Sequence, residues 1–249
     1  MKIKKNIIAL IPARSGSKRV KDKNIKVLNG RPLMSYTITE ALESRIFDRV
    51  ICSTDSNHYA EIASYYGAEV YMRSKKIASS KSPDYLWVKS LIDNLIKENY
   101  TFDIFSILRP TSPFRNKNTI GSAIKKFYSA KNIDSLRAVE LCGQHPGKMW
   151  IVNRDIMKPL FNKKINEVPW HSNQYASLPK IYVQNASLEI AWLKTILKKN
   201  SISGTKILPF ITDNLEGFDI NTMDDWVLAE HYIKKGIIKL PRIKKFKAG

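Results

Sequence analysis

Short apolar runs alternate with longer amphipathic segments through the first half of the chain. The apolar runs cover residues 6–11, 49–53, 68–72 and 102–108. Continuous apolar runs of this length are typical of strands that are buried on both faces of a parallel sheet. The segments between them repeat apolar residues about every 3.6 positions. They predict helices over residues 32–42, 57–66 and 83–98.

This order of elements, β-α-β-α-β-α-β, predicts the fold class. Strands that alternate with helical crossovers of this length form an α/β fold with a doubly wound, mostly parallel sheet. Pro32 suits the first turn of a helix, and Gly67 suits the end of the following one. Ligands bind such a sheet outside the carboxyl ends of its strands, so we expect the site in the loops that follow the strands.

The pattern breaks between residues 141 and 179, where Gly, His, Pro, Asn and Trp occur without clear periodicity. An apolar segment resumes over residues 181–193. A stretch this long without regular elements predicts an excursion from the sheet, which we place at residues 141–190 as an inserted arm. The arm is a lid over a substrate, a contact to a second subunit, or a disordered surface insert.

The last predicted element is a helix over residues 222–235. Thr222 and Asp225 make a start that resembles a capping box, and Gly236 ends the helix. The lysine-rich residues 239–247 follow, and we expect them to form a frayed and solvated end.

Composition excludes several classes of protein. With 43% hydrophobic residues among 249, the chain can bury a core, which excludes disorder. No apolar run reaches about eighteen residues, so we expect neither a membrane span nor a signal peptide. Cys52 and Cys142 have no neighbouring Cys or His at metal spacing, which excludes a disulfide scaffold and a zinc site. These features predict a protein of the reducing cytoplasm without a membrane partner.

The formal net charge of +20 has three explanations. The chain binds nucleic acid, binds a small anionic substrate, or has surface positions that are filled by lysine by default. The lysines are scattered as pairs, and most aromatic residues lie inside the periodic apolar segments rather than between basic clusters. This distribution is not typical of a nucleic-acid surface, so we expect no nucleic-acid partner.

A basic loop follows the first apolar run, and residues 11–24 have the sequence IPARSGSKRVKDKN. Backbone N–H groups and hydroxyls in such a turn can hold anionic oxygens, while Arg14, Lys18 and Lys23 supply the charge that neutralises a triphosphate. The loop matches neither a Walker A motif nor the glycine-rich dinucleotide motif. It is either a phosphate-binding loop or a solvated basic loop.

Five motifs in order carry a family resemblance. They are Ile11–Lys18 with Lys23-Asn24, then NGRPL at 29–33, STD at 53–55, PTSPFR at 110–115 and FDIN at 218–221. Together they resemble the acylneuraminate cytidylyltransferase (CMP-sialic acid synthetase) family over residues 6–235. The resemblance implies a single cytidylyltransferase domain over residues 1–249, with a fold like that of nucleotide-diphospho-sugar transferases.

The resemblance also implies a reaction. The anomeric hydroxyl of a nine-carbon or related 2-keto sugar acid attacks the α-phosphate of CTP, and pyrophosphate is released with Mg²⁺ or Mn²⁺ present. The implied partners are CTP and the sugar acid, and the family implies a homodimer. The enzyme is thus of the N-acylneuraminate cytidylyltransferase type.

On the nucleotide side, the matching positions carry the family's phosphate and base contacts. The implied nucleotide-binding residues are Ala13, Arg14, Ser17, Lys18, Lys23, Asn24, Arg73 and Ser82. The implied catalytic residues are Arg14, Lys18, Lys23 and Asp219. Arg73 matches an arginine near the cytosine ring, where a donor meets the O2 and N3 acceptors; otherwise it is an ordinary arginine at a strand end.

Asp219 and Asn221 match the paired metal site of the family, which usually reads Asp-x-Asp. Alternate residues of an extended segment place both side-chain oxygens on one side, which suits Mg²⁺. Asn221 is a departure that brings no charge. Either metal affinity falls, or Asn221 acts through water, or it only leads into the helix cap at Thr222.

The sugar side departs further from the family. The implied substrate-binding residues are Arg109, Thr111, Ser112, Lys148, Gln174 and Asn185. Arg109 replaces a family glutamine, and Asn173 stands where the sialic-acid enzymes place an arginine before the glutamine. Arg109 binds the sugar carboxylate, marks a different sugar acid, or forms a salt bridge at a strand end.

Two alternatives to the leading function stay open. The acceptor is a different 2-keto sugar acid, of the legionaminic, pseudaminic or octulosonic type, as the changes at Arg109 and Asn173 allow. From another class, the chain is a degenerate nucleotide-binding protein without turnover, as Asn221 allows. No residue in the sequence is marked as the base that takes the proton of the attacking hydroxyl.

Overall fold

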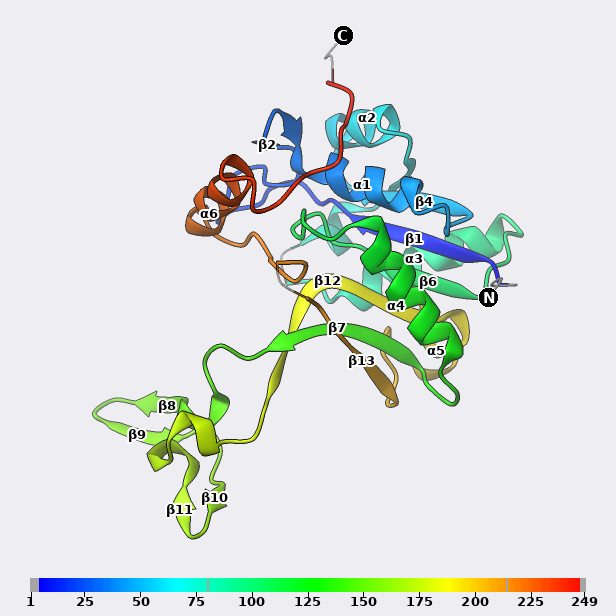
Figure 1. Ribbon diagram of the computed structural model, residues 1–249. Helices are drawn as coiled ribbons and strands as arrows, with labels where there is room; N and C mark the ends of the chain where they lie inside the picture. Colours follow the sequence, from blue (N-terminus) through cyan, green and yellow to red (C-terminus); the bar gives the residue numbers. More distant parts are fainter. Residues whose placement is uncertain (1–4, 80, 214, 247–249) are drawn as a thin grey trace. The chain divides into compact units, whose positions relative to one another are not determined.

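The computed structural model describes residues 5–79, 81–213 and 215–246 (Figure 1). They fall into two compact units, one made of residues 1–138 with 185–249 and the other of residues 139–184. The first unit is called the sheet unit below, and the second is called the arm unit.

A seven-stranded sheet forms the centre of the sheet unit, in the order β13-β7-β12-β6-β1-β4-β5. Its strands are β1 (Ile7–Pro12), β4 (Arg49–Thr54), β5 (Glu69–Met72), β6 (Ile104–Ile107), β7 (Ser135–Leu141), β12 (Tyr182–Trp192) and β13 (Ile207–Ile211). The strands β6, β1, β4 and β5 pair in parallel, and β12 is antiparallel to β6. The predicted α/β class with a mostly parallel sheet is therefore confirmed.

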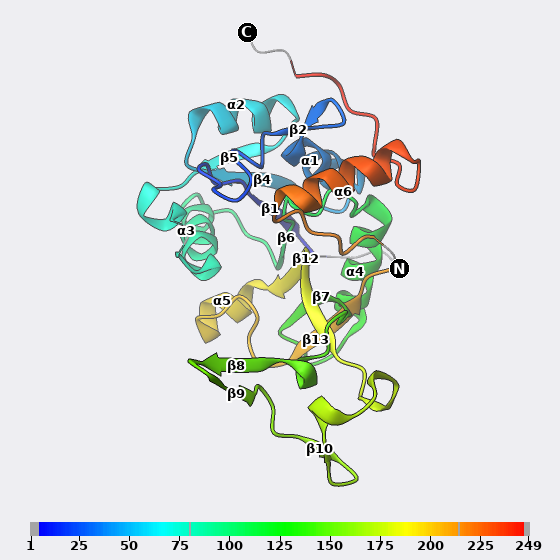
Figure 2. The ribbon, with the colours of Figure 1, turned by 90° about the vertical axis from the view of Figure 1, so that its left-hand side faces the viewer.

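Helices cover both faces of this sheet (Figure 2). They are α1 (Leu33–Glu43), α2 (Asn57–Tyr65), α3 (Asp84–Lys97), α4 (Lys117–Ser129), α5 (Leu193–Lys199) and α6 (Met223–Lys234). Along β1, Ala9 and Ile11 belong to a core cluster with α1, α2 and α4, while Ile8 and Leu10 belong to another with α3. Alternate residues of a strand point to opposite faces, so β1 must be apolar throughout.

The predicted elements of the first half agree with the structure to within two residues at each end. The later capping box is also present, because Thr222 Oγ1 accepts from Asp225 N and the Asp225 carboxylate accepts from Thr222 N. Several elements were not predicted: a short hairpin of β2 (Val27–Leu28) and β3 (Arg31–Pro32), the 3₁₀ turn η1 (Lys75–Ala78), α4, β7, α5 and β13.

The C-terminal segment corrects one expectation. Residues 243–246 are not a frayed end, because their backbone is bound by side chains of α2 and β3 in the sheet unit. Tyr65 donates its hydroxyl to Lys245 O at 2.6 Å, and Arg31 Nε donates to Ile243 O at 2.7 Å. The Phe246 ring meets Tyr65 edge-on at 5.1 Å between centroids. Lys247 lies outside the described residues.

Two hairpins and three short 3₁₀ turns make up the arm unit. The hairpins are β8 (Trp150–Asn153) with β9 (Ile156–Pro159), and β10 (Lys164–Ile165) with β11 (Val168–Pro169). The turns are η2 (Pro146–Lys148), η3 (Trp170–Ser172) and η4 (Tyr175–Ser177). His145 holds two of its segments together, since Nδ1 accepts from Gly147 N at 3.0 Å and Nε2 lies 3.0 Å from Pro179 O. Residues 185–190 of the expected arm lie instead in β12 of the sheet unit.

The two cysteines and the helices bear on the classes that composition excluded. Cys52 is buried and Cys142 is partly exposed, and both are free thiols. Among residues 5–79, 81–213 and 215–246, no helix combines the length and apolar character that crossing a bilayer requires.

Candidate active site

The basic loop, defined here as residues 13–24, leaves the carboxyl end of β1 and is anchored at both of its ends. Ala13 N donates to Ser53 O at 2.9 Å, which extends the pairing of β1 with β4. Asn24 Nδ2 donates back to Arg14 O at 3.1 Å, and Asn24 O accepts from Met34 N at the start of α1. Asn24 is buried, and its side-chain amide joins the end of the basic loop to its beginning.

Asp55, directly after β4, clamps the middle of the basic loop. Its Oδ1 accepts from Ser15 N at 2.8 Å and its Oδ2 accepts from Ser15 Oγ at 2.9 Å. Hydrogen bonds to an ionised carboxylate are stronger than neutral ones, so this pair fixes the course of the loop. Asp55 was not among the predicted site residues, although the STD motif contained the signal.

The tip of the basic loop presents its polar groups to solvent. Lys18 is exposed and Arg14 and Ser17 are partly exposed, while Val20 is buried in a core cluster with Leu28 and Tyr36. The buried valine holds the tip on the protein, and the lysine remains accessible to an anion. This is the arrangement that a phosphate-binding loop requires.

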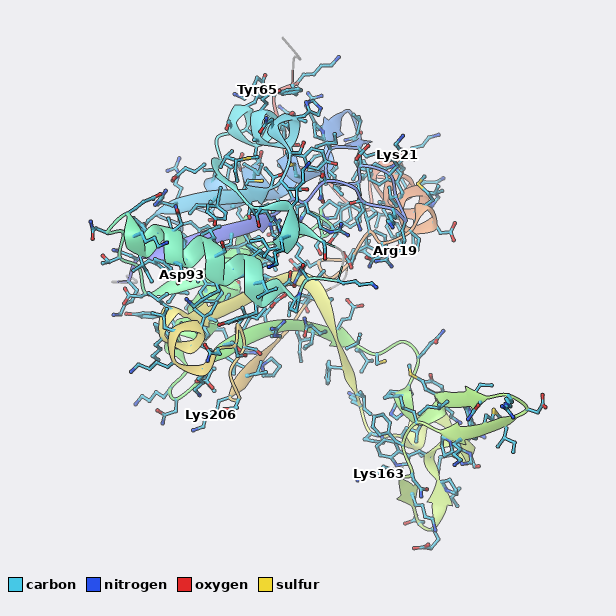
Figure 3. All side chains as sticks on the ribbon, turned by 180° about the vertical axis from the view of Figure 1, so that it is seen from behind. Arg19, Lys21, Tyr65, Asp93, Lys163 and Lys206 are labelled. Carbon is cyan, nitrogen blue, oxygen red and sulfur yellow. The ribbon has the colours of Figure 1, made fainter. Side chains whose placement is uncertain are left out.

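Lys23 connects the basic loop to the segment that carries Asp219. Its Nζ donates to Ile220 O at 2.5 Å. Burial lowers the pKa of Lys23, and the nearby charge of Asp219 opposes that shift. Arg19, which sequence reasoning did not select, also crosses to this segment, since its Nη2 donates to Asn221 Oδ1 at 3.2 Å. Figure 3 labels Arg19 and Lys21 on the side of the sheet unit where α6 lies.

Asp219 has an oxygen that suits a metal ion. Its Oδ1 is buried without a hydrogen-bond partner, and its Oδ2 accepts from Asn221 Nδ2. Ile220 N donates to Thr111 O at 2.8 Å, which fixes the segment against the loop after β6. The unpartnered oxygen fits Mg²⁺, which takes one or two carboxylates and completes its shell with water and phosphate oxygens.

Asn221 is oriented differently from a second metal ligand. Its amide nitrogen faces Asp219, its Oδ1 accepts from Arg19, and its backbone N donates to Asp225 Oδ2 at 2.8 Å. In the described ranges, no group of three or more His, Cys, Asp and Glu residues could hold a metal ion. Metal binding by Asp219 and Asn221 stays a prediction.

Arg73 is locked at the carboxyl ends of β4 and β5. Its Nη2 donates to Ser53 O at 2.6 Å, its backbone N donates to Thr54 O at 2.8 Å, and its guanidinium lies over the Trp87 ring at 5.2 Å. Burial lowers the pKa of Arg73. Its Nε is buried without a hydrogen-bond partner, so this N–H remains for a ligand acceptor.

Ser82 lies in the segment between η1 and α3. Its Oγ donates to Lys76 O at 3.2 Å and lies 3.0 Å from Ser79 Oγ. The neighbouring Ser80 lies outside the described residues. The role of Ser82 in base recognition stays a prediction.

Arg109, after β6, forms the salt bridge that was one of its three interpretations. Its Nη2 lies 2.6 Å from Asp84 Oδ2 and 2.7 Å from Glu189 Oε1. Burial of Asp84 would raise its pKa, but the charge and hydrogen bond of Arg109, the hydrogen bond from Trp87 and the charge of Arg73 together outweigh burial, and the pKa is lowered. Burial likewise opposes the charge of Arg109, yet Glu189 and Asp84 raise its pKa. The guanidinium is therefore firmly charged and already paired.

The PTSPFR motif contributes mainly through its backbone and Arg115. Ser112 Oγ is buried without a hydrogen-bond partner, and Thr111 is partly exposed. Arg115 is 1% exposed; it donates to Ser187 O and, at 2.8 Å, to Thr37 Oγ1. Burial lowers the pKa of Arg115 to about 9. Arg115 ties β12 and α1 to the loop after β6, a role that sequence reasoning missed.

The remaining sugar-side candidates fall in both units. In the arm unit, Lys148 Nζ donates to His171 O at 3.1 Å, and the backbone oxygen of the exposed Gln174 accepts from Ser177 Oγ at 2.8 Å. In the sheet unit, Asn185 is buried and its Nδ2 donates to Thr212 Oγ1 at 2.9 Å. Their contacts with a sugar stay predictions.

The candidates of the sheet unit share one edge of the sheet. The basic loop follows β1, Asp55 follows β4, Arg73 follows β5 and Arg109 follows β6. The sequence order reverses on either side of β1, which is the place where doubly wound sheets bind ligands. The arrangement offers an exposed lysine, a carboxylate oxygen without a hydrogen-bond partner and a buried arginine, which together suit a phosphorylated ligand and a metal ion.

Comparison with known proteins identifies the family to which the chain belongs. A family model described as cytidylyltransferase matches residues 8–180. The chain is 33% identical over 227 residues to the CMP-N,N'-diacetyllegionaminic acid synthase of Legionella pneumophila, covering 90% of this chain and 94% of the relative. It is 32% identical to the N-acylneuraminate cytidylyltransferase of Escherichia coli, covering 90% of this chain and 51% of that relative. It is 28% identical to the pseudaminic acid cytidylyltransferase of Campylobacter jejuni, covering 90% and 94%.

Solved structures share the fold. A CMP:2-keto-3-deoxy-manno-octonic acid synthetase in complex with CTP matches with a TM-score of 0.64 at 13% identity, covering 93% of this chain and 99% of that one. A 4-diphosphocytidyl-2C-methyl-D-erythritol synthase from Anaerococcus prevotii matches with a TM-score of 0.61 at 14% identity, covering 92% and 96%. At these identities the likeness establishes the architecture alone.

Removing the Asp55 carboxylate takes away a negative charge that repels an anion, but it also takes away the hydrogen bonds that shape the basic loop. We expect Asp55→Ala to weaken binding of tripolyphosphate at least about tenfold, because two charge-assisted hydrogen bonds that shape the loop are lost. Titration calorimetry measures the affinity. Glu61→Ala, which removes an exposed acid from α2, serves as the matched control and should change it by less than about twofold. Tighter binding by Asp55→Ala would mean that repulsion by the carboxylate matters more than the clamp.

Proposed function

The chain belongs to the cytidylyltransferase family, and on that premise we propose that it transfers CMP from CTP to the anomeric hydroxyl of a nonulosonic, sialic-acid-like sugar acid, with release of pyrophosphate. The observation that carries the proposal is the connection of the clamped basic loop, through the hydrogen bond of Lys23 to Ile220 O, to the segment that carries Asp219. The relatives named for legionaminic, neuraminic and pseudaminic acids support the class of acceptor. The cytoplasmic setting expected from composition forms part of the proposal.

In the proposed reaction the sugar's anomeric oxygen forms a bond to the α-phosphorus of CTP. The bond from that phosphorus to the oxygen bridging to the β-phosphate breaks, and pyrophosphate leaves with the electron pair. The hydroxyl proton leaves to solvent or to a base that the described residues do not identify. Phosphoryl transfer of this kind depends on alignment and on neutralising the phosphate oxygens.

Each residue at the sheet edge has a part in this proposal. Arg14 and Lys18 neutralise the phosphates, and backbone N–H groups of the loop beside Ser17 hold them. Lys23 holds the Ile220 carbonyl, which keeps Asp219 close to the loop. Arg73 offers its unpartnered Nε–H to an acceptor on the cytosine ring.

Asp219 is the proposed protein ligand for Mg²⁺, or for Mn²⁺ in its place. When bound, the ion supplies positive charge that stabilises the developing charge on the phosphates. Asp219 Oδ1 would hold it, because this oxygen is buried without a hydrogen-bond partner. Asn221, whose amide nitrogen faces Asp219, orients that carboxylate rather than replacing a second one.

Within the acceptor class we propose a sialic-acid-type sugar, with legionaminic, pseudaminic and octulosonic acids as the alternatives. The salt bridge of Arg109 favours no single one of these acids. A nucleotide-binding protein without turnover is the second candidate, favoured by the orientation of Asn221. Pyrophosphate release that depends on Mg²⁺ would exclude it.

The decisive assay is pyrophosphate release with each of the four NTPs and a panel of nonulosonic and octulosonic acids. We expect release with CTP and one acid, and a loss of at least about a hundredfold in kcat for Lys18→Ala, as for removal of one oxyanion donor. Lys21→Ala removes an exposed lysine from the same loop and should leave kcat within about twofold. If no pair of NTP and acid releases pyrophosphate, the result would favour a nucleotide-binding protein without turnover.

The metal proposal predicts opposite shifts for two variants. Asp219→Asn should raise the half-saturating concentration of Mg²⁺ at least about tenfold, and Asn221→Asp should lower it, because charge on the ligand strengthens binding of a hard cation. The measurement is pyrophosphate release across a Mg²⁺ titration. Asp224→Asn, an exposed acid in the first turn of α6, is the control. Equal curves for parent and Asp219→Asn would contradict the assignment.

We also propose a homodimer that uses the hairpin β8–β9. Support comes from its large apolar side chains, which include Val152 and Ile156, each 70% exposed. Light scattering should find a dimer for the parent and a monomer for Ile156→Asp, because a charge cannot be buried unpaired at an apolar contact. Val227→Asp, at an exposed position of α6, should remain a dimer. A monomeric parent would exclude the proposal.

A further inference from the structure

Four charged side chains from four places in the sequence form one cluster beside the candidate site. Arg109 Nη2 bridges Asp84 Oδ2 at 2.6 Å and Glu189 Oε1 at 2.7 Å, and Arg137 Nη1 lies 2.5 Å from Glu189 Oε2. Glu189 is only 7% exposed in its side chain, and Arg137 16%. Two cations and two anions compensate one another, so the cluster carries no net charge.

The backbone of Arg109 is held as firmly as its guanidinium. Its carbonyl oxygen accepts from Arg115 Nη1 at 3.3 Å, from Ser112 N at 3.3 Å and from Thr37 Oγ1 at 3.4 Å. Arg115 is buried and makes further bonds to Ser187 O and Thr37. The Arg109 side chain therefore starts from a fixed point and ends between two fixed carboxylates.

Asp84 links Arg109 to Arg73 through the side chain of Trp87. While Oδ2 accepts from Arg109, Oδ1 accepts from Trp87 Nε1 at 2.7 Å. The Trp87 ring is 2% exposed and lies against the Arg73 guanidinium at 5.2 Å. Contacts thus run from the strand β12, through Arg109 and α3, to Arg73, whose Nε has no hydrogen-bond partner.

We propose that Arg109 is a positioning residue for nucleotide binding, acting through Asp84 and Trp87 on Arg73, and that it does not bind the carboxylate of the sugar acid. The inference rests on the proposed function, because it assigns Arg73 to the cytosine end of CTP. It names a role for the arginine that stands at the family's glutamine position.

The charges argue against carboxylate binding by Arg109. A guanidinium that already neutralises Asp84 and Glu189 offers little net attraction to a third carboxylate, which would be repelled by both neighbours. Removal of Arg109 would leave the buried Glu189 with Arg137 alone and would leave Asp84 without its ion-pair partner. The first turn of α3 would then lose its ion pair to the loop after β6, and the carboxylate that accepts from Trp87 Nε1 would lose its anchor.

The test compares CTP affinity with sugar-acid kinetics in the full-length protein. Arg109→Gln, which restores the family residue type, should weaken CTP binding about tenfold by calorimetry, because small misplacements of a recognition group are costly. KM for the sugar acid should stay within about twofold, and discrimination between CTP and UTP should fall. Arg109→Lys retains the positive charge between the carboxylates and should keep CTP affinity within about threefold, because the role rests on that charge.

A double-mutant cycle checks the route of the effect. If Arg109 acts through Asp84, then Asp84→Asn combined with Arg109→Gln should bind CTP no more weakly than the worse single variant. Arg49→Gln breaks a salt bridge with Glu69 at the amino ends of β4 and β5, away from the site, and should leave CTP affinity unchanged. Additive losses in the cycle would overturn the route through Asp84.

Two further outcomes separate this inference from the proposed function. A rise in KM for the sugar acid in Arg109→Gln, or unchanged CTP affinity, overturns the positioning role. A parent that binds CTP without releasing pyrophosphate overturns the proposed function, while the calorimetric comparison still decides the role of Arg109. A parent that binds no CTP overturns both.

Discussion

Burial of β1 on both faces is the constraint on which the rest of the sheet unit depends. Because Ile8 and Leu10 face one layer and Ala9 and Ile11 the other, helices must pack on both sides of the sheet. Parallel neighbours on both sides of β1 then place every following loop at the same edge. Cationic side chains that lie far apart in the sequence are brought to that edge by the sheet, and not by contacts with one another.

At that edge, the protein holds its cations by carbonyls and carboxylates of its own. Lys23 and Arg73 are bound to backbone carbonyls, and Arg109 is bound to two acids. The exposed Lys18 is thus the more available charge for an incoming anion. The large positive charge of the chain is therefore less informative than the few positions where a cation is both oriented and accessible.

The sequence was sufficient to predict the strands and helices whose apolar pattern is set by full burial. It was insufficient to predict elements that are only partly buried. The strand β13 alternates exposed and half-buried residues, and β7 carries Arg137 within it, so neither resembles a buried parallel strand. The C-terminal segment was misjudged because its backbone carbonyls accept from Tyr65 and Arg31, and because Lys244 and Phe246 pack on the Tyr65 ring, contacts that a lysine-rich composition does not reveal. In the site, the motifs located the loops, but the clamp by Asp55 and the bridge by Arg19 depend on side-chain directions that spacing does not fix.

The two departures from the family pattern have unequal consequences for charge. Replacing a metal-site carboxylate by Asn221 removes one negative charge beside Asp219, and replacing a glutamine by Arg109 adds one positive charge after β6. The second change is cancelled locally, because Asp84 and Glu189 lie against the guanidinium. The first has no such compensation, since Arg19 binds the Asn221 oxygen and brings a further positive charge. The segment around Asp219 is thus where this chain differs electrostatically from the family pattern, and any metal held there relies more on the phosphates of the nucleotide than on the protein.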